Sequence, residues 1–223
     1  RTGHDGPEKP TILFVVNVSW FFISHRLELA MQAARAGYDV HVATCVASAD
    51  DARVIRNSGL ALHHVRMGRS GMPGIFDLVA LAELLLLTRR LRPALVHLVG
   101  VKPILIGGVV ARMTSVATVM AITGLGHAFI QGAYWSNLRS WMIVRAIRFV
   151  TGRPRCAVIF QNEEGRDAFV SRRIVAPEAA HLIRGSGVDL QHYRFLPEPA
   201  GPVRVVLASR MLRTKGIPEF VAA

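Results

Sequence analysis

The chain alternates short apolar runs with longer segments in which apolar residues recur every three to four positions. Short apolar runs rich in Val and Ile are typical of buried strands, and the longer period is typical of helices. This alternation predicts βαβ units, and therefore an α/β fold built on a doubly wound parallel sheet. The predicted strands are residues 11–18, 38–45, 60–66, 94–99, 116–122, 155–160 and 181–184, and the predicted helices are residues 25–36, 49–57, 76–91, 103–113, 137–150 and 163–170.

The last twenty residues start the pattern again. Residues 203–216, VRVVLASRMLRTKG, predict a strand, a turn and the beginning of a helix. A segment with prolines and no clear periodicity precedes them, as expected of a linker. We therefore expect a flexible lead-in over residues 1–10, a main domain over 11–190, a linker over 191–202, and the truncated beginning of a second domain over 203–223.

The chain is strongly basic without being densely charged. Its formal net charge is +12, although only 19% of its residues are charged. Of its 27 basic residues only Lys9, Lys102 and Lys215 are lysines. Either the composition is biased towards arginine, or the charge attracts anionic partners such as nucleotides, diphosphate lipids or a membrane surface. Nucleic acid is not the expected partner, because no zinc-finger, RRM or basic-helix pattern is present.

The spacing of the cysteines and the length of the apolar stretches indicate in which cellular compartment the protein works. Cys45 and Cys156 lie far apart and lack C-x-x-C spacing, which favours two free thiols in a reducing compartment. The longest apolar stretches, residues 78–87 and 103–111, are shorter than the ~18 residues that a membrane-spanning helix needs. No signal peptide is visible, and a removed leader stays open because the chain does not begin with Met.

The segments that follow the strands are the candidate binding elements, because ligands of parallel sheets bind beyond the carboxyl ends of the strands. Residues 19–24 after the first strand are expected to form a loop with three aromatic side chains. Ser24 is the candidate N-cap of the next helix, and His25 would then lie at its N-terminus, facing an anionic group. The alternative is that the aromatic rings pack over the sheet and that His25 is structural.

Three cations are candidate anion-binding groups. Lys102 follows the fourth strand at a helix N-terminus, where a Lys and free backbone amides suit an anion; an ordinary solvated Lys is the alternative. Arg210 and Lys215 flank the turn after residues 203–208, where the two charges could clamp a diphosphate.

The segment after the fifth strand, ITGLGHAF, is the candidate catalytic loop. Gly124 and Gly126 would let the backbone approach a ligand closely. Thr123 and His127 could donate hydrogen bonds to a sugar, and the alternative for His127 is a plain surface position. No G-x-G-x-x-G fingerprint accompanies any of these loops, so an ordinary dinucleotide site is not predicted.

The predicted helix at residues 137–150 mixes aromatic side chains with arginines. One interpretation is an interfacial helix on an anionic membrane. The other is a helix partly buried in the core, with arginines that reach the solvent. The poorly defined polar face favours the second interpretation slightly.

Taken together, the chain resembles the family 4 glycosyltransferases, which are retaining enzymes of the GT-B fold. Four stretches carry the resemblance: NVSWFFISHRLELA, VHLVGVKPILIGGVVAR, ITGLGHAF, and IRGSGVDL followed by VLASRMLRTKGIPEF. The resemblance extends over nearly the whole chain after residue 10, with these stretches in the family's order and at its spacing. The resemblance implies a Rossmann-like N-terminal half that holds the acceptor, followed by the start of the half that binds the nucleotide sugar.

The resemblance also implies an activity. The first and third stretches resemble bacterial enzymes of lipopolysaccharide O-antigen and capsule synthesis. Such enzymes transfer a hexose or an N-acetylhexosamine from a UDP-sugar to a polyprenyl-diphosphate-linked or lipid A-core acceptor. A cytoplasmic protein, peripheral on the inner face of the inner membrane, is implied, with no metal and no further cofactor. This chain is expected to be inactive by itself.

The family's site maps onto few positions of this sequence. Arg210 and Lys215 match the cations that hold the donor diphosphate, where they would stabilise the leaving UDP. Thr123 stands where many members have a His that contacts the donor sugar, and His127 lies four residues later. The acceptor or cleft side would comprise Ser24, His25, Lys102, Gly124 and Gly126. The alternatives are a UDP-sugar 2-epimerase of similar fold and a non-catalytic domain that binds membrane or glycan.

Overall fold

The computed structural model describes residues 9–67, 75–123 and 138–185, together with residues 187–188, 190–191, 193–197, 201–209, 211 and 215–223. The chain divides into two compact units, Arg1–Gly187 and Val188–Ala223. Gly124, Gly126, His127 and Arg210 lie outside the described residues.

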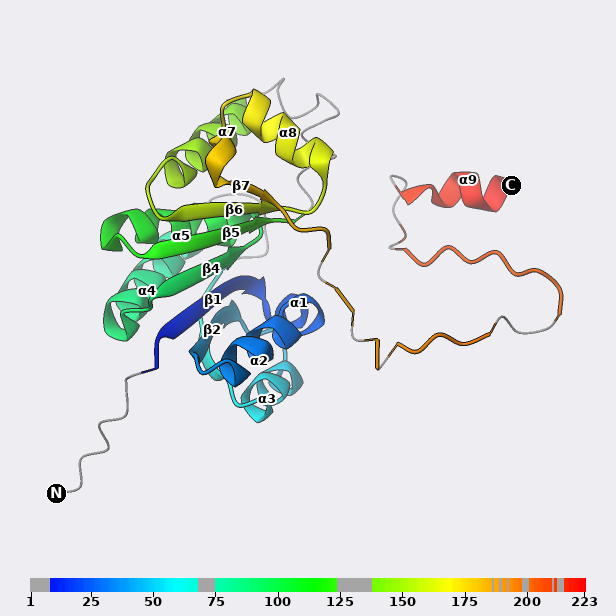
Figure 1. Cartoon of the computed structure of the whole chain (residues 1–223), viewed down its shortest axis with the longest axis horizontal. Helices are drawn as coiled ribbons and strands as arrows, with labels where there is room; N and C mark the ends of the chain where they lie inside the picture. Colours follow the sequence, from blue (N-terminus) through cyan, green and yellow to red (C-terminus); the bar gives the residue numbers. More distant parts are fainter. Residues whose placement is uncertain are drawn as a thin grey trace. The chain divides into compact units, whose positions relative to one another are not determined.

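A parallel sheet forms the centre of the first unit (Figure 1). In the described part of the chain it has seven strands in the order β3-β2-β1-β4-β5-β6-β7. All neighbouring strands run parallel, which confirms the predicted doubly wound α/β class. The strands are β1 (Thr11–Val18), β2 (Asp39–Cys45), β3 (Ala61–His64), β4 (Leu95–Val99), β5 (Ala117–Ile122), β6 (Cys156–Phe160) and β7 (Ala180–Leu182).

Helices lie on both faces of this sheet. One face packs against α1 (Ser19–His25), α2 (Leu27–Arg35) and α3 (Ala49–Asn57). The other packs against α4 (Ile75–Leu91), α5 (Val101–Thr114), α7 (Leu138–Thr151) and α8 (Glu163–Ser171). β1 contributes Phe14 and Val16 to the first core and Leu13 and Val15 to the second. Its continuous apolar run is therefore that of a strand buried on both faces.

Side-chain caps fix the starts of two helices. Ser48 Oγ accepts a hydrogen bond from the Asp51 amide at the start of α3, at 3.1 Å. Asn162 Oδ1 accepts one from the Gly165 amide at the start of α8, at 2.8 Å. Each cap satisfies a backbone donor that has no partner inside its helix.

Two adjacent glycines bring α5 close to its neighbours. A Cβ atom added to Gly107 would lie 2.5 Å from Leu98 Cδ2 of β4, and one added to Gly108 would lie 2.6 Å from Val150 Cβ of α7. Separations this short are below van der Waals contact, so a side chain at either position would force a neighbouring atom to move.

The second unit contains the short helix α9 (Ile217–Ala222). The prediction of a strand at residues 203–208 is wrong, because these residues form no strand. A strand needs a neighbour for its backbone hydrogen bonds. No strand is described within Val188–Ala223, so this apolar stretch has no such neighbour there and its Val203, Val205 and Val206 are exposed.

Candidate functional site

The carboxyl ends of β1, β4 and β5 lie side by side in the sheet. Val16 of β1 is aligned with Val99 of β4, and Val99 with Ala121 of β5. The strand order reverses between β1 and β4, because β1 is followed outwards by β2 and β4 by β5. Such a switch point opens a crevice in which parallel α/β proteins bind ligands. The segments after these three strands therefore form the candidate site.

The segment after β1 is a helix, so the prediction of a loop at residues 19–24 is wrong. Aromatic and β-branched residues are weak helix formers, and the SWFFIS sequence therefore did not predict one. Tertiary contacts outweigh that preference here. Phe22 is fully buried against the edge of the Phe14 ring, and Ser19 Oγ accepts a hydrogen bond from the Ala47 amide at 2.9 Å.

The predicted roles of Ser24 and His25 at a helix N-terminus are also wrong. Both residues lie in the last turn of α1, and Arg26 occupies the N-cap position of α2. The predicted helix at residues 25–36 thus breaks at Arg26, whose φ of −133° is not helical. A helix C-terminus favours a cation rather than an anion, so His25 stands in the opposite helix field from the one expected.

His25 is nevertheless held in a defined orientation at the site. Its ring is stacked on Phe21, with centroids 4.3 Å apart, and its Nδ1 lies 2.6 Å from Ser24 Oγ. Ser24 Oγ donates its one hydrogen to the Trp20 carbonyl oxygen, 2.9 Å away. With that hydrogen on the Trp20 carbonyl, the neutral form of the His25 ring donates Nδ1–H to Ser24 and keeps a lone pair on Nε2. The exposed ring can accept a hydrogen bond from a bound hydroxyl group.

Lys102 is paired rather than solvated. Its Nζ lies 2.8 Å from Asp77 Oδ1 of α4, and both side chains are only 16% exposed. The Asp77 carboxylate largely neutralises the positive charge of Lys102, which the sequence predicted to bind an anion. Asp77 lies far from Lys102 in the sequence, so only the packing of α4 on α5 reveals this pair. α5 begins directly after β4, so its first backbone amides still face the carboxyl edge of the sheet. No side chain caps them, because the N-cap residue is Gly100.

A pair of buried polar side chains beneath α1 and α2 was missed by sequence reasoning. His97 of β4 is 6% exposed and packs edge-on against Phe14, with ring centroids 5.2 Å apart. Burial, and then the nearby charge of Arg26, lower the pKa of His97 to about 4. Arg26 is itself 7% exposed, and its Nη1 donates to the His25 carbonyl oxygen at 2.8 Å. For His97 the signal was present, because it is a polar residue inside the apolar run LVHLV.

Asn17 lies at the end of β1, where the register with β2 shifts between Val16 and Val18. Its Oδ1 is buried and has no hydrogen-bond partner among the described residues. No sequence pattern marked this Asn, at the carboxyl edge of the sheet, as a site residue.

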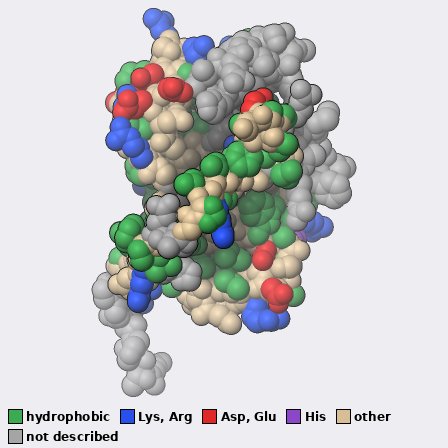
Figure 2. Space-filling view, turned by 90° about the vertical axis from the view of Figure 1, so that its right-hand side faces the viewer, with side chains coloured by type: hydrophobic (Ala, Val, Ile, Leu, Met, Phe, Trp, Pro, Cys, Tyr) green, Lys and Arg blue, Asp and Glu red, His purple; other side chains and the backbone are tan. Residues whose placement is uncertain are grey.

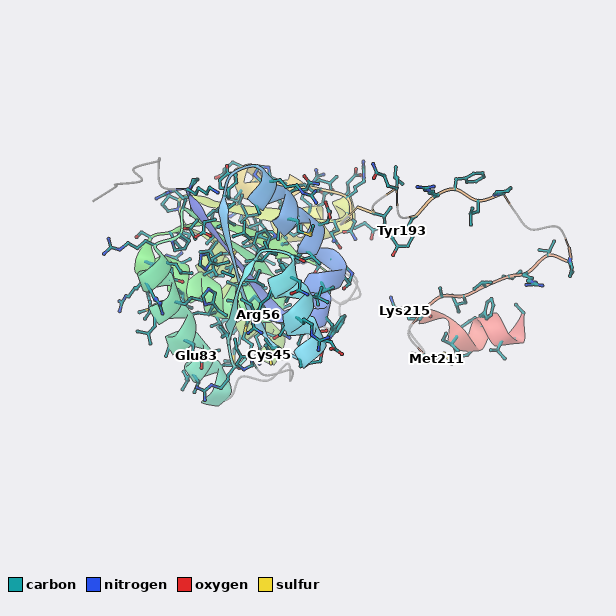
Figure 3. All side chains as sticks on the ribbon, turned by 90° about the horizontal axis from the view of Figure 1, so that it is seen from below. Cys45, Arg56, Glu83, Tyr193, Met211 and Lys215 are labelled. Atoms are coloured by element: carbon teal, nitrogen blue, oxygen red, sulfur yellow. The ribbon has the colours of Figure 1, made fainter. Side chains whose placement is uncertain are left out.

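The remaining predicted site residues divide between two units. Thr123 follows β5 directly and is half-buried at the carboxyl edge. Lys215 belongs to the second unit, where it is exposed just before α9 (Figure 3). The catalytic role predicted for Thr123 and His127 and the diphosphate clamp of Arg210 and Lys215 stay predictions.

In the part of the chain that the structure describes, no group of three His, Cys, Asp or Glu side chains is arranged to hold a metal ion. Both cysteines are free thiols, as predicted. Within the same residues, no helix is both long and apolar enough to span a bilayer. Basic side chains on the face in Figure 2 are spread among acidic and apolar ones rather than gathered into one patch.

Known proteins share this sequence pattern and this sheet. The family described as "Glycosyl transferase 4-like" matches residues 11–152. Comparison with curated proteins gives no significant match.

Among solved structures, the fold is similar to that of Anabaena HepE in complex with UDP and glucose, with a TM-score of 0.61 and 12% identity over 84% of this chain and 47% of HepE. It is also similar to a UDP-N-acetylglucosamine 2-epimerase (TM-score 0.58, 12% identity, 78% of this chain and 48% of that one). A third similar structure is sucrose-phosphate synthase from Thermosynechococcus elongatus (TM-score 0.55, 12% identity, 82% and 49%). The chain thus spans about half the length of each of these proteins.

Proposed function

The chain belongs to the glycosyl transferase 4-like family, which its residues 11–152 match, and from that membership we propose that it forms the acceptor-side half of a retaining glycosyltransferase. The donor is a UDP-sugar, and the transferred group is a hexose or an N-acetylhexosamine. The acceptor is a lipid-linked saccharide of bacterial surface polysaccharide, such as an O-antigen or lipopolysaccharide precursor. The enzyme works at the inner face of the inner membrane.

The observation that carries this proposal is the carboxyl edge of β1, β4 and β5. His25 offers Nε2 as an acceptor for a sugar hydroxyl, and Phe21 holds its ring in place. The uncapped N-terminus of α5 offers backbone amides to an anionic group of the same ligand. A hydrogen-bond acceptor for a sugar hydroxyl beside a site for phosphate suits a saccharide carried on a diphosphate lipid.

In this proposal, residues of the second unit bind the diphosphate of the sugar donor. Because Lys102 is neutralised by Asp77, we assign the donor diphosphate to Arg210 and Lys215. Two fixed cations would stabilise the departing UDP without a metal ion. Thr123, Gly124, Gly126 and His127 would surround the transferred sugar. HepE, which shares the fold, was solved with UDP, and this supports a UDP-linked donor.

Helix α7 supports an acceptor that resides in a membrane. One face of α7 buries Ile147 and Val150 in the core, and the opposite side exposes Trp141, Met142 and Phe149. Arg145 lies over the Trp141 ring at 5.2 Å. Exposed aromatic rings beside arginines are typical of helices that lie at the surface of an anionic bilayer. The proposal therefore combines the two interpretations of this helix: one face is packed in the core, and the other would contact the membrane.

Transfer is best tested with a protein that also carries the donor half, because the chain spans about half of each similar structure. We expect transfer from a UDP-sugar to a lipid-linked acceptor in anionic vesicles, undiminished by EDTA. NMR should show the same anomeric configuration in donor and product. Residues 1–223 alone should give no transfer and only weak UDP-sugar binding in calorimetry. An inverted anomer would refute the retaining mechanism, and tight UDP-sugar binding by residues 1–223 would refute the assignment of the donor site.

A UDP-sugar 2-epimerase is the second candidate, because one of the similar structures has that activity. The same incubation without acceptor distinguishes the two. Conversion of UDP-N-acetylglucosamine into its 2-epimer, followed by NMR, would favour the epimerase. Recovery of the unchanged nucleotide sugar, with transfer once acceptor is added, would favour the transferase.

His25→Phe tests the acceptor side of the site. The substitution keeps a ring on Phe21 but removes both nitrogens, so a hydrogen bond to the acceptor is lost. We expect the KM for the acceptor to rise about tenfold with a smaller change in kcat. His181→Phe on exposed β7 is the control and should leave both constants unchanged. Equal kinetics for the two variants would show that His25 does not contact the acceptor.

A further inference from the structure

A second hollow lies at the opposite, amino edge of the sheet. It has a volume of about 590 Å³ and is lined by the C-terminal ends of α4 and α5 and by the residues that lead into β4, β5 and β6. This volume is in the range of pockets that bind small molecules. The candidate site described above lies beyond the other ends of these strands, so the two are separate.

The lining of this hollow is basic. Arg89, Arg92 and Arg155 line it, and no acidic side chain does. Among the described residues, none of these three arginines forms an ion pair. The C-termini of α4 and α5 contribute about half a negative charge each, which leaves a net charge of about +2 at the hollow. The three arginines therefore carry more positive charge than is needed to balance the partial negative charges of the two helix C-termini.

Neighbouring arginines at the same edge have structural partners. Arg112 donates to the Phe149 and Gly152 carbonyl oxygens at 2.6 and 2.7 Å, where it caps the end of α7. Arg153 donates to the Val116 carbonyl oxygen at 2.5 Å. Burial lowers the pKa of Arg153, and the like charges of Arg112 and Arg155 lower it further. Positive charge is thus crowded at this edge of the sheet. Unlike Arg112 and Arg153, the side chains of Arg89, Arg92 and Arg155 make no hydrogen bond to a carbonyl oxygen within the described residues.

The backbone of the lining is unusual as well. The described residues include four non-glycine positions with positive φ, and three of them, Arg92, Ser115 and Arg155, line this hollow. A left-handed backbone is unfavourable for residues with a Cβ, and glycine is the usual choice where a helix ends in this conformation. The chain instead places an arginine after α4 and a serine after α5.

We propose that this hollow is a second anion site, which binds a ligand through a phosphate group. Arginine presents a planar set of donors that matches phosphate oxygens in pairs, and Ser115 adds a hydroxyl at the rim. The hollow lies at the opposite edge of the sheet from the candidate site, so the proposal stands independently of the proposed function. The phosphate belongs either to a soluble phosphorylated compound or to a lipid headgroup.

Binding of inorganic pyrophosphate and of vesicles tests the proposal. Calorimetry measures pyrophosphate affinity, and co-sedimentation compares vesicles of phosphatidic acid in phosphatidylcholine with phosphatidylcholine alone. The test variant is Arg92→Gln/Arg155→Gln. The matched control is Arg53→Gln/Arg56→Gln, which removes the same charge from the exposed surface of α3 (Arg56 in Figure 3). Circular dichroism melts check that both variants fold.

Pyrophosphate affinity is expected to fall about 100-fold in Arg92→Gln/Arg155→Gln and less than threefold in the control. That result supports a soluble ligand. Selective loss of phosphatidic acid binding in the same variant, without pyrophosphate binding, supports a lipid headgroup. If the chain binds neither probe, or if both double variants lose affinity equally, there is no specific site and the proposal is overturned.

Discussion

The free energy of unfolding is expected to fall by about 3 kcal/mol between pH 6.5 and pH 4 because of His97 alone. Burial, and then Arg26, lower the pKa of His97 from 6.5 to about 4, so the folded protein holds this ring neutral. In that interval the unfolded chain binds the proton and the folded chain does not. The contribution is therefore complete above pH 6.5 and is lost as the pH falls towards 4. Urea unfolding at a series of pH values measures it.

His97→Leu isolates this effect. The substitution keeps an apolar side chain beside Phe14 and removes the titrating ring, so the acid-induced loss should shrink by most of those 3 kcal/mol. A smaller slope should persist, because burial and then His41 and Arg90 also lower the pKa of His63. His181→Leu on the exposed strand β7 is the control and should keep the wild-type slope. A His97→Leu profile parallel to wild type would show that His97 is not held neutral.

Gly108→Ala is expected to destabilise the fold by about 2 kcal/mol, although alanine is the better helix former by about 1 kcal/mol. The added Cβ would lie 2.6 Å from Val150 Cβ, an atom next to the backbone of α7 that cannot turn away. The two helices must therefore separate, and the contacts around them are lost. For a chain of this size the melting temperature should fall by roughly 4–8 °C, measured by calorimetry.

Gly107→Ala is the matched comparison. Its Cβ would meet Leu98 Cδ2, a methyl group at the end of a side chain that has other rotamers. We expect a smaller loss than for Gly108→Ala, partly offset by the better helix propensity. If Gly108→Ala proved the milder substitution, or had no effect, the close packing of α5 on α7 would be wrong.

The sheet was predictable because its signal is local. β1 and β5 are continuous apolar runs, and such runs leave little choice other than a strand buried on both faces. α1 was not predictable, since its aromatic residues are weak helix formers and only the packing of Phe22 against Phe14 favours the helix. The expected strand at residues 203–208 has a strand-like sequence. The segment forms no strand because its backbone needs a neighbouring strand to hydrogen-bond to, and the presence of that neighbour cannot be read from residues 203–208 themselves.

The candidate site was predictable in place but not in chemistry. The order of strands and helices located the segments after β1, β4 and β5. The state of each side chain depends on residues distant in sequence: Lys102 is neutralised by Asp77, and Arg26 is brought over His97 by the break between α1 and α2. Spacing alone cannot show such contacts, whereas burial of a polar residue in an apolar run is a signal that sequence reasoning can use.

The position of β1 between β2 and β4 has a consequence for synthesis on the ribosome. β1 pairs with β2 on one side, through Thr11 and Asp39, but its other edge waits for β4, where Ile12 meets Leu95. At ribosomal rates of about 5–20 residues per second, that edge stays unpaired for several seconds after β1 has emerged. TILFVVNV, which is apolar at every position except Thr11 and Asn17, is then a strand with an open edge. Of the described strands that are paired on both sides in the finished sheet, β1 is thus the one whose edge stays open longest during synthesis.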